Sequence, residues 1–264
     1  MRAFIKSLNP ESEPSERPFG NFEAGVLITT CLGLMFIQFV GGELSFRSLF
    51  GDWLLDGAVF PSQYERIQAM KAHEWYGLMK LGHWSVCCLI GYMAFPIIFM
   101  RLTGRPLTSL HLSLAGTWQH RGTYLRLALI MLPPVIYVAS WENYQDIYPF
   151  YDQAGRSWTD LLIWECLYLS QFLALEFFFR GFMLSQLRPW AGHGAIFIMV
   201  IPYCMIHFPK TGSETLGAII AGIVLGALAL RGRSIWGGVF LHCSIALTMD
   251  LLCLYHAGTL SRLF

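Results

Sequence analysis

Seven long apolar stretches dominate this sequence of 264 residues and restrict what it can fold into. A helix needs about 20 mainly apolar residues to cross the hydrocarbon core of a bilayer. These stretches are continuous rather than alternating, and in lipid only helices and closed barrels satisfy every backbone polar group. The pattern therefore predicts an all-α fold, a polytopic transmembrane helical bundle of about seven spans. The stretches cover roughly 24–42, 79–101, 123–141, 159–186, 193–208, 214–231 and 234–256.

The composition favours lipid as the main solvent of the chain. Only 13% of the residues are charged and 55% are hydrophobic, whereas soluble domains carry about 25% charged residues. The net charge of +1 gives no support for a nucleic-acid partner. The seven cysteines lie in apolar stretches without a Cys-x-x-Cys pair, so neither a disulfide framework nor a cysteine zinc site is indicated.

The distribution of lysine and arginine predicts the orientation in the membrane. Arg105 and Arg121 lie in the connection between the second and third stretches, and Arg101 and Arg126 lie in the adjoining ends of those stretches. Short loops rich in such residues stay in the cytoplasm. The positive residues on the other side are spread over longer loops. We therefore expect a cytoplasmic N-terminus and an external C-terminus. The polar residues 1–22 lack the features of a cleavable signal and are expected to form a flexible cytoplasmic tail.

Two segments between the apolar stretches are polar and aromatic. Residues 43–78 mix charged side chains with Trp and Tyr, which predicts an interfacial helix followed by a loop. Residues 142–158 are acidic and rich in tyrosine, which is typical of a loop at the membrane interface.

The fourth apolar stretch contains ionisable residues, which are costly inside a membrane. Glu165, Glu176 and Arg180 all lie within it, and each charge costs at least ~2.5–3.5 kcal/mol on insertion scales. Glu176 and Arg180 are four residues apart and share one helix face. They therefore form either an ion pair that only stabilises the bundle or part of a functional site.

Two histidines occur in comparable surroundings. His207 lies at the end of the fifth stretch, where an interfacial histidine with a purely structural hydrogen bond is the simpler interpretation. His242 and Asp250 lie two turns apart in the last stretch. At ~1.5 Å per residue, Glu176, His207 and His242 lie roughly 18, 21 and 13 Å from the cytoplasmic face. We therefore predict that three helices bring these side chains to a similar depth, as one candidate site.

A carboxylate beside two imidazoles is compatible with three chemistries. Glu176 can act as a general base towards water, with His207 and His242 positioning the water or stabilising an oxyanion. Alternatively, the three side chains match the His₂Glu ligand set of zinc metalloproteases, although no His-Glu-x-x-His motif is present. The pair His73-Glu74 has no second histidine at the required spacing and is expected at the surface. The third possibility is a proton relay in a transporter, for which no inverted repeat is visible.

Three short motifs in the second half resemble the family of CAAX prenyl protease and bacteriocin-processing proteins, which are intramembrane glutamic endopeptidases. That family's pattern is EExxxR, then FxxxH, then HxxxN. The sequence LEFFFR keeps Glu176 and Arg180. The sequence YCMIH keeps His207, and HCSIA keeps His242. The resemblance covers about 159–256.

This resemblance implies a domain organisation. Residues 23–158 would hold N-terminal transmembrane helices with interfacial loops, 159–256 a catalytic core, and 257–264 a short C-terminal tail. The sequence departs from the family pattern at three positions, where Leu175 replaces the first Glu, Tyr203 replaces the Phe and Ala246 replaces the Asn. Asp250, one turn beyond Ala246, is the expected replacement for that Asn.

The resemblance also implies an activity. We expect an intramembrane endopeptidase in which Glu176 activates water, with His207, His242, Arg180 and Asp250 as the other site residues. The resemblance implies that this activity needs no cofactor. A zinc-dependent activity is the alternative. The expected partners are the lipid bilayer and a membrane-anchored or C-terminally sorted protein, in a bacterial cytoplasmic membrane. The competing hypotheses are a non-catalytic adaptor or immunity protein on the same scaffold and a proton-coupled transporter.

Overall fold

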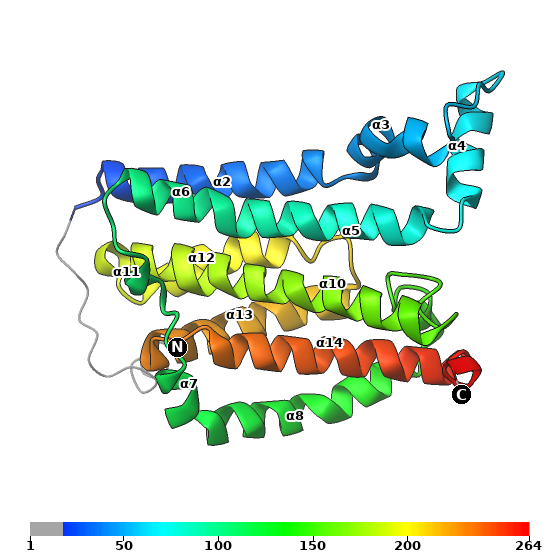
Figure 1. The fold of residues 1–264 in the computed structure, drawn as a ribbon. Coiled ribbons are helices and arrows are strands. Elements are labelled where there is room, and N and C mark those ends of the chain that lie inside the picture. Colours follow the sequence, from blue (N-terminus) through cyan, green and yellow to red (C-terminus); the bar gives the residue numbers. More distant parts are fainter. Residues whose placement is uncertain (1–17, 264) are drawn as a thin grey trace. The chain divides into compact units, whose positions relative to one another are not determined.

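The computed structural model describes residues 18–263, and it is built of helices (Figure 1). Residues 1–17 of the predicted N-terminal tail lie outside the described residues. Within residues 18–263 there is no β-strand, so the predicted all-α class is confirmed. The α-helices are α2 (Asn21–Val40), α3 (Glu43–Leu54), α4 (Gln63–Ala72), α5 (Tyr76–Leu89), α6 (Phe95–Leu102), α7 (Ala115–Gln119), α8 (Arg121–Ala139), α9 (Glu142–Gln145), α10 (Trp158–Glu176), α11 (Ser185–Ala191), α12 (Gly194–Met205), α13 (Gly212–Gly232) and α14 (Trp236–His256).

Short helical segments of other kinds join or follow some of these helices. A π-helical segment, Ile90–Ala94, joins α5 to α6, and a second one, Phe177–Leu184, joins α10 to α11. Two 3₁₀ segments are Leu107–Leu110 and Leu260–Leu263.

Six continuous helical segments in the described part of the chain are long and apolar enough to cross a membrane. This confirms a multi-pass membrane protein, with a number of spans close to the predicted seven. They are Asn21–Val40, Tyr76–Leu102, Arg121–Ala139, Trp158–Ala191, Gly212–Gly232 and Trp236–His256.

The remaining predicted span, 193–208, is only partly helical. Its helix α12 has 12 residues, which corresponds to ~18 Å, whereas the hydrocarbon core is ~30 Å thick. The helix ends at Met205, shortly before Pro209, and a residue before proline is biased away from the helical conformation. His207 therefore lies two residues beyond the end of this helix.

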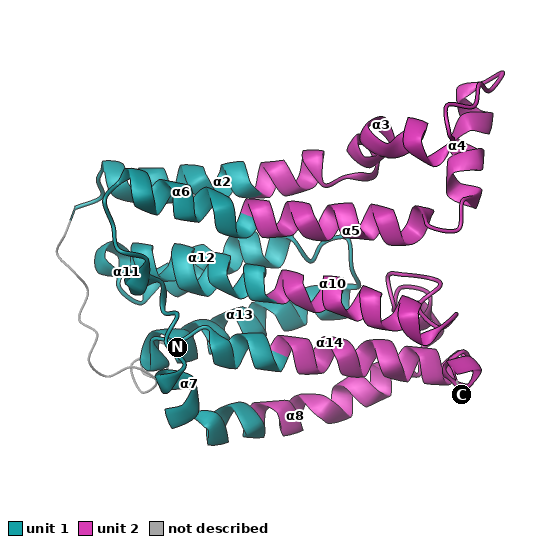
Figure 2. Ribbon diagram, viewed as in Figure 1, with its two compact units in different colours: residues 1–33, 92–126, 173–241 teal, residues 34–91, 127–172, 242–264 magenta. Residues whose placement is uncertain are grey.

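The chain divides into two compact units, each assembled from separate stretches of sequence (Figure 2). Unit 1 takes residues 92–126 and 173–241 together with the described part of 1–33. Unit 2 takes 34–91, 127–172 and 242–264. Each unit thus draws on both the predicted N-terminal helices and the predicted core.

In unit 1, close packing of α12 against α13 depends on glycine. A Cβ atom at Gly222 would lie 2.8 Å from Val200 and 3.1 Å from the ring of Tyr203. One turn later, a Cβ at Gly226 would lie 3.1 Å from Met199. Small residues at this spacing let helix backbones approach closely in membranes.

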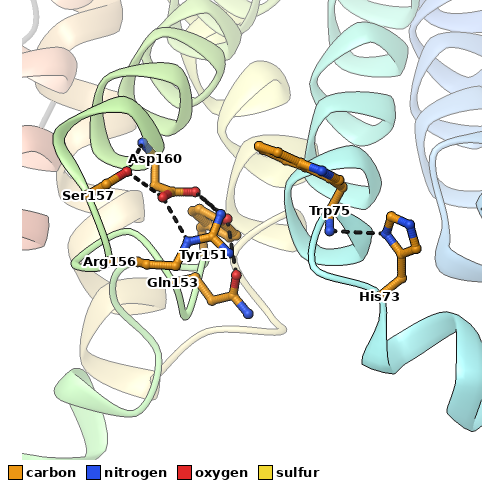
Figure 3. Close-up of polar contacts among 7 residues, drawn as sticks. All are labelled: His73, Trp75, Tyr151, Gln153, Arg156, Ser157 and Asp160. Carbon is orange, nitrogen blue, oxygen red and sulfur yellow. Dashed lines mark hydrogen bonds and ion pairs between the residues drawn. The ribbon is translucent and has the colours of Figure 1, made fainter.

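In unit 2, a network of polar contacts fixes the start of α10 (Figure 3). The Ser157 hydroxyl accepts a hydrogen bond from the Asp160 backbone N–H at 3.1 Å, which caps the helix. The Asp160 carboxylate accepts from the Tyr151 hydroxyl at 2.8 Å and pairs with Arg156 at 2.8 Å. The Arg156 guanidinium also lies 5.7 Å from the ring centre of Trp75. These contacts tie the loop before α10 to the start of α5.

The two polar segments are both ordered. Residues 43–78 contain the two helices α3 and α4 before α5 begins. Within 142–158, the rings of Tyr144, Tyr148 and Tyr151 are buried in the core of unit 2. This predicted loop is therefore held by its own tyrosines.

Candidate functional site

Glu176 and Arg180 form a buried ion pair at the junction of α10 with the π-helical segment Phe177–Leu184. The Arg180 Nη1 lies 3.0 Å from the Glu176 Oε1. Both residues are almost fully buried, at 1% and 0% exposure. Removing either partner would leave a buried charge uncompensated, which is strongly destabilising. π-helical turns interrupt α-helices most often at functional sites.

Tyr203 of α12 connects this ion pair to His207. The Arg180 guanidinium lies 4.2 Å from the centre of the Tyr203 ring, as in a cation–π contact. The Tyr203 and His207 rings are 5.0 Å apart, centre to centre. His207 Nδ1–H donates a hydrogen bond to the Tyr203 carbonyl oxygen at 2.8 Å. In the neutral imidazole this leaves Nε2 as the nitrogen without a proton.

Gly238 of α14 supports the carboxylate of Glu176 from another side. A Cβ atom at Gly238 would lie 2.3 Å from the Glu176 Oε2, so only glycine leaves room for the carboxylate here. The neighbouring Gly237 leaves room for Tyr124 in the same way, because a Cβ atom at Gly237 would lie 2.0 Å from the Tyr124 ring. The two adjacent glycines therefore leave room for side chains from two other helices.

Tyr124 is a site residue that sequence reasoning missed. It lies on α8, is 8% exposed, and its ring fills the space beside Gly237, next to the glycine that faces Glu176. No motif marks it, and the family resemblance does not extend to the third apolar stretch. Only the position of Gly237 beside Gly238 carries a signal for it, since two adjacent glycines indicate two close neighbours.

His242 and Asp250 belong to unit 2, on the following part of α14. The Phe172 ring stacks on the His242 ring at 5.6 Å with an interplanar angle of 12°. The fully buried Asp250 accepts a hydrogen bond from Trp164 Nε1 at 2.8 Å, and the Glu165 carboxyl also contacts it. Both predicted residues therefore contact side chains of α10.

The structure thus gathers the predicted residues in two groups. Unit 1 connects Glu176, Arg180 and His207 through Tyr203. Unit 2 connects His242 and Asp250 to the aromatic side chains of α10. A single site that contains all five stays a prediction.

The alternative of a zinc site also stays a prediction. Among residues 18–263, no three His, Cys, Asp or Glu side chains are grouped as metal ligands. His73, the other histidine in a motif, has a local role in a turn, because its Nδ1 accepts a hydrogen bond from the Trp75 backbone N–H at 3.2 Å (Figure 3).

The comparison with protein families concerns this part of the chain. The fold defines an all-α multi-pass membrane protein. Residues 157–248, roughly a third of the chain, match the model of the type II CAAX prenyl endopeptidase Rce1-like family. The match confirms the resemblance inferred from the motifs, and it includes Glu176, Arg180, His207 and His242 but ends before Asp250. No curated protein and no solved structure matches the chain significantly.

Proposed function

We propose that this protein is an intramembrane endopeptidase that hydrolyses a peptide bond near a membrane-embedded or lipidated segment of a protein substrate. The observation that carries the proposal is the buried Glu176 carboxylate, paired with Arg180 and seated against Gly238. It lies within the region that matches a family of CAAX-type endopeptidases. A buried carboxylate at a fixed position is what general-base catalysis inside a membrane needs.

In the proposed reaction Glu176 activates a water molecule. The carboxylate takes a proton from the water while the water oxygen attacks the carbonyl carbon of the scissile peptide. The C–N bond of the resulting tetrahedral intermediate then breaks, and the proton passes from Glu176 to the leaving amine. Arg180 keeps the carboxylate oriented through the ion pair at 3.0 Å.

The two histidines would serve the water and the oxyanion. With Nδ1–H donated to the Tyr203 carbonyl, the neutral His207 offers Nε2 as an acceptor for a water proton. His242 would stabilise the negative charge that develops on the peptide oxygen. Asp250 would support His242 from the same helix.

The single carboxylate is compatible with this mechanism. Leu175, at the position of the family's first Glu, is buried with 4% exposure and adds only apolar surface. One carboxylate is sufficient to act as base and then as acid within a catalytic cycle. The substitution at this position therefore changes the surroundings of the base without removing it.

The proposed substrates are membrane-anchored or C-terminally sorted proteins, and the proposed location is a bacterial cytoplasmic membrane. The test compares cells that carry the wild-type protein, Glu176→Gln or the control Glu23→Gln, which alters another buried glutamate. Mass spectrometry of the membrane fraction should show unprocessed proteins accumulating only with Glu176→Gln. Equal processing by all three proteins would overturn the proposal.

The same experiment separates the competing functions. A non-catalytic adaptor predicts loss of a binding partner without any precursor, and a transporter predicts gradient-dependent uptake into liposomes. For the metal question, we propose a metal-free mechanism, so purified protein should keep its activity in a strong chelator. Loss of activity in the chelator and its recovery with Zn²⁺ would instead support zinc held by Glu176, His207 and His242.

A further inference from the structure

Two side-chain contacts fix the register between α10 and α14 in unit 2. Trp164 donates to Asp250 at 2.8 Å, and Phe172 stacks on His242 at 5.6 Å. The two contacts lie two helical turns apart, from Trp164 forward to Phe172 on α10 but from Asp250 back to His242 on α14. The helices are therefore antiparallel here, and the same register places Tyr168 opposite Ala246.

On the α10 side, this register forms a continuous column of rings. Trp164 and Tyr168 stack at 4.8 Å with an interplanar angle of 15°, and Tyr168 meets Phe172 edge to face at 5.0 Å. The three residues are spaced by four, so they lie on one helix face. They are all buried, with exposures of 0%, 2% and 8%. We call Trp164, Tyr168 and Phe172 the aromatic ladder.

We infer that the aromatic ladder positions the imidazole of His242, and that Asp250 acts by anchoring Trp164 rather than by contacting substrate. The terminal χ2 torsion of histidine is broad and does not fix the ring plane on its own. A ring stacked at 12° on a buried phenylalanine restricts that torsion. The hydrogen bond from Trp164 to Asp250 fixes the other end of the ladder.

The ladder also accounts for the departure at Ala246. Ala246 and Tyr168 belong to the same buried cluster of unit 2. A methyl group opposite Tyr168 lets the ring column pack against α14. The orienting function that a polar residue at this position would provide is then supplied by packed rings.

A spectroscopic test addresses the ladder without relying on protease activity. The protein would be labelled with ¹³C-histidine in detergent micelles, and the His242 ring signals assigned by their loss in His242→Gln. In Phe172→Leu these signals should move downfield, because the shielding by the stacked ring is lost. The control Tyr148→Leu removes a buried ring of the same cluster that stacks on Tyr144 and Phe150, and it should leave the signals in place. Unchanged His242 signals in Phe172→Leu would overturn the inference.

A second variant tests the role of Asp250 and covers the case in which Phe172→Leu does not fold. Trp164→Phe keeps a ring in the ladder but removes the hydrogen-bond donor to Asp250. It should broaden or shift the His242 signals, and Asp250→Leu, which removes the acceptor, should do the same. If neither variant changes them, Asp250 does not act through the ladder.

The expected effect of the aromatic ladder on cleavage kinetics rests on the proposed protease function. Phe172→Leu should lower kcat about 10- to 100-fold with little change in KM, as expected for a misplaced catalytic group. Phe172→Trp should restore most of the activity, and Tyr148→Leu should retain it. A rise in KM with unchanged kcat would contradict a positioning role. Shifted His242 signals in a protein whose wild type cleaves nothing would instead refute the protease and leave the ladder intact.

Discussion

Gly238 is the residue whose identity most directly determines where the Glu176 carboxylate can lie. Its missing side chain is the space that the Glu176 carboxylate occupies, since a Cβ there would lie 2.3 Å from Oε2. No rotation of a helical Cβ relieves such a contact, so the carboxylate would have to move.

Replacing Gly238 by alanine should therefore displace Glu176 and reduce cleavage at least 100-fold, because a small misplacement of a catalytic group is enough for such a loss. The matched control is Gly217→Ala on α13, where a Cβ meets nothing within 4 Å. Cleavage rates of the purified variants provide the measurement. Near-normal activity in Gly238→Ala would show that the carboxylate position is unimportant.

His111 is predicted to make stability depend on pH. Burial, aided by the charge of Arg233, lowers its pKa to about 4, and its Nδ1 is buried without a hydrogen-bond partner. The unfolded chain takes up a proton near pH 6.5 while the folded protein does not. The free energy of unfolding should therefore fall as the pH decreases from about 6.5 towards 4, by about 2 kcal/mol at pH 5.

Unfolding of the purified protein in denaturing detergent at pH 5 and pH 7 measures this effect. His111→Phe should lose the corresponding part of the pH dependence. Equal pH dependence in the variant and the wild type would show that His111 is not the responsible group.

At the scale of elements, α10 carries both the candidate base and the aromatic ladder. Its first turn is held by Ser157, whose hydroxyl accepts from the backbone N–H of Asp160. Its last residue is Glu176, after which the π-helical segment begins.

Ser157→Ala should lower the free energy of unfolding by about 1 kcal/mol, the usual cost of removing an N-cap. The control Ser170→Ala removes a hydroxyl in the middle of the same helix, where it bonds only to the Leu167 carbonyl. That change should alter stability by no more than a few tenths of a kcal/mol. Equal effects of the two substitutions would contradict the capping role.

Helix identity was predictable from sequence, but several boundaries were not. Hydropathy located all seven helical regions because lipid leaves few alternatives to a helix. It overestimated α12, since the apolar residues after Met205 continue beyond the helix. It also gave no indication of the two π-helical segments, Ile90–Ala94 and Phe177–Leu184.

For the candidate site, sequence predicted residue types and helices but not their contacts. The spacing of Glu176 and Arg180 indicated their ion pair correctly, because the pair lies within one helix turn. Tyr124 and Phe172 were not predicted, since contacts between helices distant in sequence depend on register. Register here depends on small residues such as Gly238 and Ala246, which carry no chemical signal by themselves.

At the scale of the whole molecule, the charge distribution predicts that the two ends of the chain lie on opposite sides of the membrane. Cysteines introduced at Lys6 and at Ser261 would be labelled with a membrane-impermeant maleimide in intact cells. The cysteine at 261 should react and the one at 6 should react only after lysis. Reaction at 6 in intact cells would reverse the proposed orientation.

The central claim is that Glu176 is the base of a membrane protease. The most direct measurement is cleavage by purified protein in liposomes, with quenched fluorescent peptides that carry either a prenylated CAAX end or a transmembrane segment. Glu176→Gln should abolish cleavage when the amount of folded protein in the liposomes is matched to that of the wild type, and Glu23→Gln should cleave at the wild-type rate. Cleavage by Glu176→Gln at the wild-type rate would contradict the mechanism.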